Sequence, residues 1–111
     1  MNDDTLKALQ GSIAKWEAIV AGTEADKGYL NCALCKRFGD SCARDDGGGE
    51  KCPVMIETGM DSCTGSPYDA WADAFSWSDH DDRSTKGLKA TTPELIALAQ
   101  AELDFLKSLL P

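Results

Sequence analysis

Cysteine is the residue type in this sequence that points most directly to chemistry. All five cysteines lie in one central stretch, and the segments on either side of it contain none. Cys32 and Cys35 are separated by two residues, and Cys42, Cys52 and Cys63 follow. Two cysteines at the first spacing can hold one metal ion from a single turn, and a structural zinc site takes four such ligands. The cysteines therefore predict a metal site.

The second pair of ligands has to come from the last three cysteines. Cys42 adjoins a stretch rich in glycine and acidic residues, whereas Cys52 and Cys63 each adjoin a predicted helix start or turn that would fix their positions. Zinc is the favoured metal, and an iron–sulfur cluster is the alternative because it is also held by four thiolates. Cys42 could replace Cys52 or Cys63. The preferred ligands are Cys32, Cys35, Cys52 and Cys63.

Lys36 and Arg37 follow the first cysteine pair directly. Positive charge near a thiol favours the thiolate, so we expect these two side chains to lower the pKa of the neighbouring cysteines. If the site instead held an iron–sulfur cluster or a redox-active dithiol, Cys42 would be the spare, reactive sulfur.

The expected compartment is the cytoplasm. The first residues, Met1-Asn2-Asp3-Asp4, are the opposite of the basic start of an export signal, and no apolar run approaches the roughly 18 residues of a membrane span. Disulfides are rare in a reducing cytosol, and an odd number of cysteines suits a closed disulfide framework poorly. Both observations favour metal ligation.

The chain is acidic, with a formal net charge of -8 at pH 7. Binding to nucleic acids or anionic membranes needs a basic surface, so we expect neither. An acidic surface can instead steer a basic protein partner. The candidate contact residues are Asp69, Asp73, Asp79, Asp81 and Asp82.

A catalytic site is not expected. His80 is the only histidine and stands between acidic residues in a polar stretch, where we expect it to be exposed. No nucleophile, base and orienting residue form a recognisable set. A small metal-dependent enzyme that uses His80 or the nearby aspartates is the remaining catalytic alternative.

Two long helices are predicted to frame the cysteines. Residues about 4–21 carry an apolar stripe at steps of three and four, with Asp3 or Asp4 as the cap and Gly22 at the end. Residues about 92–110 carry a second stripe, with Thr91 or Thr92 as the cap. Each helix alone would leave its apolar face exposed, so we expect the two to pack antiparallel.

The centre, about residues 29–66, has few large aliphatic side chains and should need the metal to fold. A short helix should start at Pro53 and end at Gly59. Ser66 and Asp69 should form a capping box for an aromatic helix at about 67–78, and an acidic linker should follow at about 79–90. The sequence thus predicts one mainly α domain, residues 1–111, with two long terminal helices packed around a metal-stabilised, cysteine-rich knot with short helices.

A series of short motifs runs through most of the chain: Lys15-Trp16-Glu17, Cys32-x-Leu34-Cys35, Cys52-Pro53-Val54, Thr58-Gly59, Cys63-x-Gly65-x-Pro67-Tyr68-x-x-Trp71 and Glu102-Leu-x-Phe105-Leu106. In these motifs the chain resembles a group of small cysteine-rich proteins encoded by bacteriophages and prophages. Ala33 stands where such proteins often have proline, and the gap between Cys42 and Cys52 is longer than expected for the group.

The resemblance implies an origin and a metal site, and no particular activity. Together with the acidic charge, it leads us to expect a non-catalytic, zinc-stabilised protein in the cytoplasm of a bacterial host. Such a protein would bind a host or phage protein, for example as an inhibitor of a host defence or nucleic-acid enzyme. The alternatives are an iron–sulfur or thiol redox protein and a small metal-dependent enzyme.

Overall fold

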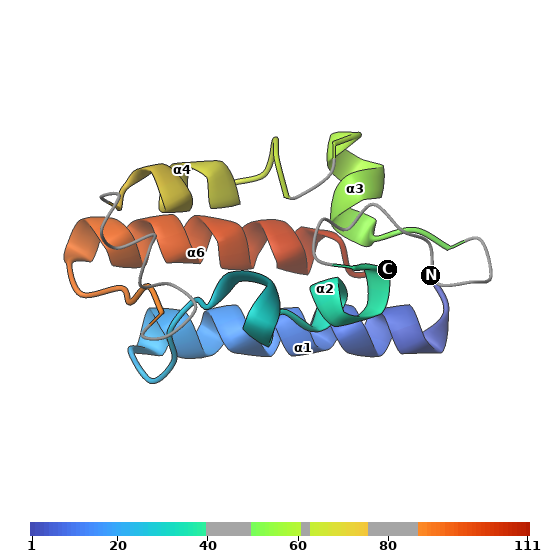
Figure 1. Cartoon of the computed structure of the whole chain (residues 1–111), viewed down its shortest axis with the longest axis horizontal. Helices are drawn as coiled ribbons and strands as arrows, with labels where there is room; N and C mark the ends of the chain where they lie inside the picture. The colour runs from blue at the N-terminus through green and yellow to red at the C-terminus, as the bar shows by residue number, and fades with distance from the viewer. Residues whose placement is uncertain (40–49, 61–62, 76–86) are drawn as a thin grey trace.

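The computed structural model describes residues 1–39, 50–60, 63–75 and 87–111. Two long helices dominate it: α1 (Asp3–Ala21) and α6 (Pro93–Ser108). They pack against each other and run in opposite directions, as their apolar stripes predicted (Figure 1). The expectation of a mainly helical fold is confirmed.

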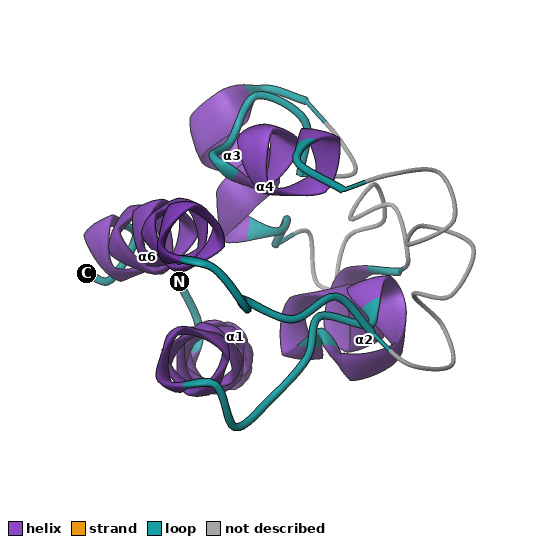
Figure 2. Cartoon of the chain, turned by 90° about the vertical axis from the view of Figure 1, so that its left-hand side faces the viewer, coloured by secondary structure: helices purple, strands orange, loops and turns teal. Residues whose placement is uncertain are grey.

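Four short helical segments accompany this pair in the part of the chain that the structure describes. The 3-10 segment η1 (Gly28–Asn31) leads into α2 (Ala33–Phe38), which packs on α1. The helix α4 (Tyr68–Asp73) packs on α6. Figure 2, a view along the long helices, shows α2 and α4 on different sides of the α1–α6 pair.

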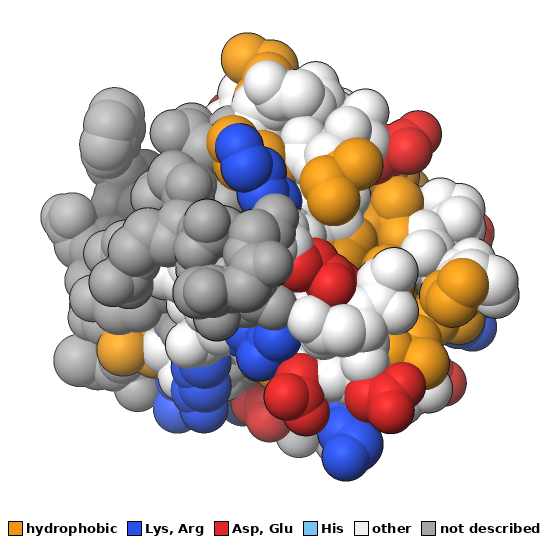
Figure 3. All heavy atoms as spheres, turned by 90° about the vertical axis from the view of Figure 1, so that its right-hand side faces the viewer, with side chains coloured by type: hydrophobic (Ala, Val, Ile, Leu, Met, Phe, Trp, Pro, Cys, Tyr) orange, Lys and Arg blue, Asp and Glu red, His pale blue; other side chains and the backbone are white. Residues whose placement is uncertain are grey.

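The remaining short helix, α3 (Pro53–Thr58), lies at the end of the molecule where both termini meet (Figure 1). Several exposed apolar side chains come from this helix, the residues just after it and the termini. Figure 3 views this end and shows hydrophobic side chains at the surface among acidic and basic ones. The exposed apolar residues from these segments are Met1, Ile56, Met60 and Leu110.

The helix ends follow the expected chemistry with some shifts. Asn2, rather than Asp3 or Asp4, caps α1, because its Oδ1 accepts a hydrogen bond from the Thr5 N–H at 2.8 Å. Gly22 ends the helix in the left-handed conformation, with φ of 83°. For α6 the cap is Thr92, whose hydroxyl accepts from the Leu95 N–H at 3.2 Å.

The start of α4 differs from the expected capping box. The Ser66 hydroxyl accepts from the Tyr68 N–H at 3.2 Å, while Asp69 accepts from the Gly65 N–H at 2.9 Å instead of from the cap residue. The helix was expected to run to about residue 78 but ends at Asp73, and residues 74 and 75 are not helical. Residues 76–78 lie outside the described part. The expected linker at 79–90 is described only from residue 87 onward.

An isolated antiparallel bridge ties the segment after α1 to the segment before α6. Asp26 and Leu88 exchange two backbone hydrogen bonds, both 2.8 Å long. Gly87, beside this bridge, has φ of 80°, and a Cβ atom there would lie 2.5 Å from the Cβ of Ala25. Only glycine fits this close approach, so Gly87 sets the position of Asp26.

The core lies mainly between α1, α4 and α6, with apolar side chains added from α2 and α3, and includes four aromatic residues in edge-on contact. The ring of Trp16 on α1 is 5.9 Å from Tyr68 and 5.3 Å from Trp71, and Trp71 is 4.9 Å from Phe75. The aromatic face of α4 therefore packs on α1. None of the helices in the described ranges is both long and apolar enough to cross a membrane.

Candidate metal centre and buried polar network

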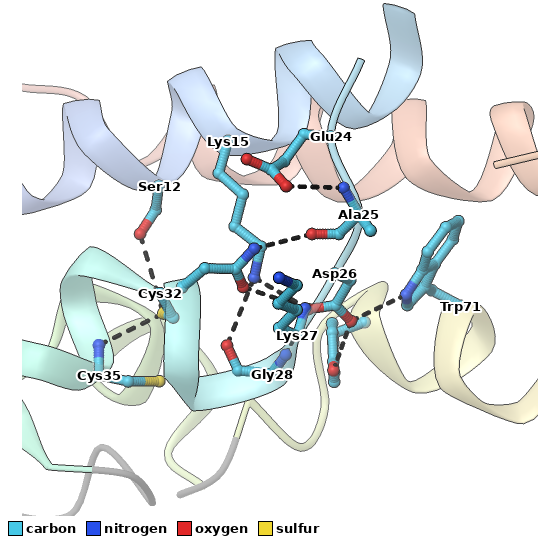
Figure 4. A network of polar contacts seen from close by, with 12 residues as sticks. Ser12, Lys15, Glu24, Ala25, Asp26, Lys27, Gly28, Cys32, Cys35 and Trp71 are labelled. Atoms are coloured by element: carbon cyan, nitrogen blue, oxygen red, sulfur yellow. Dashed lines mark hydrogen bonds and ion pairs between the residues drawn. The ribbon is translucent and has the colours of Figure 1, made fainter. Parts of the chain in front are cut away.

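The first cysteine pair is built into the start of α2. Cys32 is the cap residue of this helix, and its Sγ accepts a hydrogen bond from the Cys35 backbone N–H at 3.3 Å. The Ser12 hydroxyl of α1 lies 3.9 Å from the same sulfur and accepts from the Leu34 N–H at 3.4 Å (Figure 4). The pair is thus anchored to α1, with a backbone donor directed at the sulfur.

The pKa of Cys32 is raised above its ordinary value, against the expectation from the basic residues that follow. The main cause is the hydrogen bond with the neighbouring Cys35 thiol, and burial adds to it, while the charge of Lys15 acts in the opposite direction. The basic side chain of Arg37 points elsewhere: it donates to the Thr5 hydroxyl at 3.0 Å. Without a bound cation, the neutral thiol is therefore the favoured form of Cys32.

Cys52 and Cys63 flank α3. Cys52 is buried and directly precedes the helix, and its carbonyl accepts from the Ile56 N–H at 3.0 Å. Cys63 is half-buried and adopts a left-handed backbone conformation, with φ of 60°, which is uncommon for a residue other than glycine. Its carbonyl accepts from the Ser66 hydroxyl at 2.6 Å. Both cysteines are thus held by local turns, as expected.

The described residues contain no group of three or more cysteine, histidine, aspartate or glutamate side chains that could hold a metal ion. The structure brings together Cys32 and Cys35, which can supply two thiolate ligands after losing their protons. Cys42 and His80 lie outside the described residues. The four-cysteine ligand set remains a prediction.

The acidic residues expected to contact a partner fall into two groups. Asp69 and Asp73 are exposed on α4. The other three, Asp79, Asp81 and Asp82, lie outside the described residues.

A second cluster of chemically active side chains surrounds Asp26, which is completely buried. Its Oδ1 atom lies 2.9 Å from Nζ of Lys15 and accepts from the Gly28 N–H at 2.9 Å. Its Oδ2 atom accepts from the Tyr68 hydroxyl at 2.7 Å and from Nε1 of Trp71 at 3.0 Å. Figure 4 shows Lys15 and Trp71 reaching Asp26 from different sides. One carboxylate therefore joins α1, the connector after it and α4.

The surroundings keep Asp26 ionised. Burial is the largest influence on its pKa and raises it, but the charge and hydrogen bond of Lys15, together with the donors Tyr68 and Gly28, outweigh burial and lower the pKa below the ordinary value of 3.8. A buried carboxylate is tolerated when it is paired and hydrogen-bonded in this way.

Glu102 on α6 is a second buried carboxyl group, only 3% exposed. Burial, followed by the negative charge of Asp26, raises its pKa from 4.5 to about 7; Asp69 acts in the same direction, while Lys15 and a hydrogen bond with Ser66 oppose the rise. Its Oε2 atom has no hydrogen-bond partner among the described residues. Glu102 is therefore poised between its neutral and charged forms near neutral pH.

This network was not predicted from the sequence. Helical spacing could have indicated that Glu102 is buried. Glu102 follows Ala99 by three residues and precedes Leu106 by four, so it falls on the apolar stripe of its helix. Lys15 similarly precedes Ile19 by four residues, at the edge of the stripe on α1. Asp26 gives no such signal, because it stands in a polar connector.

The network and the cysteine pair share one face of α1. Ser12, beside Cys32, and Lys15, bonded to Asp26, are three residues apart and lie on the same side of the helix (Figure 4). The charge of Lys15 acts on both Cys32 and Asp26. Cys32 and Asp26 therefore share Lys15 as an electrostatic neighbour.

Comparison of the chain with protein-family models, with curated proteins and with solved structures found no match. The case for a function therefore rests on the residues and geometry described above.

Proposed function

We propose that this chain is a non-catalytic, zinc-stabilised protein that binds a basic protein partner through an acidic surface. The observation that carries the proposal is the first cysteine pair. Cys32 and Cys35 occupy one turn, and a backbone N–H donates to the Cys32 sulfur at 3.3 Å. A donor in this position stabilises a metal-bound thiolate, which is the form of cysteine that zinc binds.

Bound zinc would overcome the raised pKa of Cys32. A neighbouring thiol and burial both disfavour the thiolate. A divalent cation reverses this preference, since a coordinating thiol is deprotonated outright. Cys52 and Cys63 are the proposed second pair of ligands, with Cys42 as the alternative to either.

We assign the metal a structural role because the buried carboxylate of the described residues takes part in packing contacts between helices. The buried carboxylate of Asp26 is occupied by Lys15, Tyr68 and Trp71, all of which belong to the packing of α1 and α4. A catalytic base needs access to a substrate proton. A completely buried, paired carboxylate does not provide that access.

The proposed partner surface begins on α4, where Asp69 and Asp73 are exposed. The net charge of -8 supports attraction to a basic surface rather than to a nucleic acid. A partner bound in this way should associate more slowly as the salt concentration rises.

Native mass spectrometry before and after chelation tests the metal site. We expect one zinc ion per chain in the wild type, loss of the ion in Cys32→Ser, and retention in Cys42→Ser, which is the matched control. Equal loss of zinc in the two variants would place Cys42 among the ligands. A wild-type chain that carries no stoichiometric metal would contradict the zinc site.

Affinity capture from a host extract tests the acidic surface. Asp73→Lys reverses one exposed charge on α4, and Glu17→Lys makes the same change of charge at an exposed position on α1. We expect a captured partner to be retained by the wild type and by Glu17→Lys but lost with Asp73→Lys. Retention by all three proteins would show that binding of the partner does not depend on the charge at Asp73.

An iron–sulfur or thiol redox protein is the second candidate, favoured by the contact between Cys32 and Cys35. The raised pKa of Cys32 is an argument against a reactive dithiol, because the attacking species is the thiolate. Anaerobic preparation separates the candidates: visible absorbance near about 400 nm indicates an iron–sulfur cluster, whereas a colourless protein with bound zinc excludes it.

A further inference from the structure

Glu102 lies in the core at the middle of α6, where a full negative charge is poorly compensated. The residue is 3% exposed, and its Oε2 atom has no hydrogen-bond partner in the part of the chain that the structure describes. An unpaired buried charge costs far more than a buried neutral acid. The protonated form of Glu102 is therefore the form that suits this position.

The charged groups that face Glu102 come from each element packed around it. Lys15 on α1 is positive, whereas Asp26 in the connector and Asp69 on α4 are negative, and Ser66 before α4 supplies a hydrogen bond. Lys15 is already paired with Asp26 at 2.9 Å. Ionisation of Glu102 would therefore add a negative charge for which the described surroundings hold no second cation.

The short helix α4 is the shorter of the two helices that contribute polar partners to Asp26, and it begins beside Glu102. It has six residues, whereas α1 and α6 have 19 and 16. Two donors, Tyr68 and Trp71, attach it to Asp26, and Ser66 at its start contacts Glu102. Displacement of residues 66–71 would let water reach Glu102 while the two long helices stay packed.

We propose that Glu102 makes the docking of α4 pH-dependent: the protonated acid keeps α4 packed on α1 and α6, and its ionisation loosens residues 66–71. The inference goes beyond the proposed function and does not depend on the metal. Since α4 also carries Asp69 and Asp73, loosening it would change how the acidic surface is presented to a partner.

The sign of the effect follows from the two protonation states. The pKa of Glu102 is about 7 in the folded protein and about 4.5 in a solvated chain. The stability that protonation contributes is complete below about pH 4.5 and is lost as the pH rises through about 7. The transition therefore falls close to neutral pH.

The test compares the wild type with Glu102→Gln and with Glu17→Gln, all prepared in the same way. Glutamine keeps the shape of the side chain and cannot ionise, and Glu17 is exposed on α1, so it controls for the substitution itself. Relative to Glu102→Gln, the unfolding equilibrium constant of the wild type should rise on the order of a hundredfold between pH 5 and pH 8. Glu17→Gln should behave like the wild type. Equal pH dependence in all three proteins would overturn the proposal.

Local loosening is measured separately by hydrogen exchange at the indole N–H of Trp71, which donates to Asp26. Protection of this proton at pH 8 should be at least tenfold lower in the wild type than in Glu102→Gln, with no difference at pH 5. If Glu102→Gln does not fold, the carboxyl carbon of Glu102 in the wild type can be titrated directly by NMR. A midpoint near 7 supports the switch, and a midpoint near 4.5 overturns it.

Discussion

At the scale of single residues, the stability of the core depends on how Asp26 is satisfied. Its two carboxylate oxygens receive four partners from three segments of the chain, including the Lys15 ammonium at 2.9 Å. The side chains of Lys15 and Asp26 are only 8% and 0% exposed. A buried ion pair of this kind contributes little net stability compared with apolar residues, but removal of one partner alone is costly.

Asp26→Asn should therefore destabilise the protein by about 3 kcal/mol, because Lys15 would keep a buried charge without its counter-charge. The double variant Lys15→Met with Asp26→Asn should be more stable than Asp26→Asn alone. Urea unfolding of the wild type, both single variants and the double variant measures this coupling. Additive effects would mean that the two charges act independently, contrary to the geometry.

At the scale of elements, the helix boundaries are set by short-range hydrogen bonds at their ends. Thr92 accepts a bond from the Leu95 N–H at the start of α6, whereas Thr91 lies outside the cap. Both threonines are exposed, so they form a matched pair.

Thr92→Ala should lower the free energy of unfolding by about 1 kcal/mol through loss of the cap. Thr91→Ala should change it by less than about 0.5 kcal/mol, as is usual for an exposed residue without such a role. Thermal or urea denaturation of the two variants distinguishes them. A larger loss with Thr91→Ala would place the cap one residue earlier.

The long helices could be predicted from the sequence because their apolar residues recur at helical steps, and this signal is local. The contact between Trp16 and Trp71 could not, because the two residues are far apart in the chain and either could have packed elsewhere. The same holds for Asp26, whose buried position depends on the close passage at Gly87. Glu102 was in principle visible as a polar residue on an apolar stripe.

In the candidate metal centre, too, the local geometry could be predicted from the sequence, whereas the contacts between distant segments could not. The local geometry of Cys32 and Cys35 follows from their spacing and the start of α2. The second pair of ligands depends on how distant segments approach one another, which spacing does not determine. The buried network shows this too, since Lys15, Tyr68, Trp71 and Glu102 meet in or beside it from segments far apart in the chain.

At the scale of the whole molecule, the described core is formed by α1, α4 and α6 around the aromatic residues and Asp26, together with apolar side chains of α2 and α3. The proposed metal centre would add a second connection, between the starts of α2 and α3 and the turn at Cys63. In a small domain, the free energy of metal binding contributes directly to folding.

The most direct test of the zinc-stabilised structure is thermal unfolding, followed by far-UV circular dichroism, with and without a zinc chelator. We predict that chelation lowers the melting temperature and broadens the transition, with loss of helical signal from α2 and α3, and that added zinc restores both. An unchanged melting curve and helical signal after chelation would contradict a structural role for the metal.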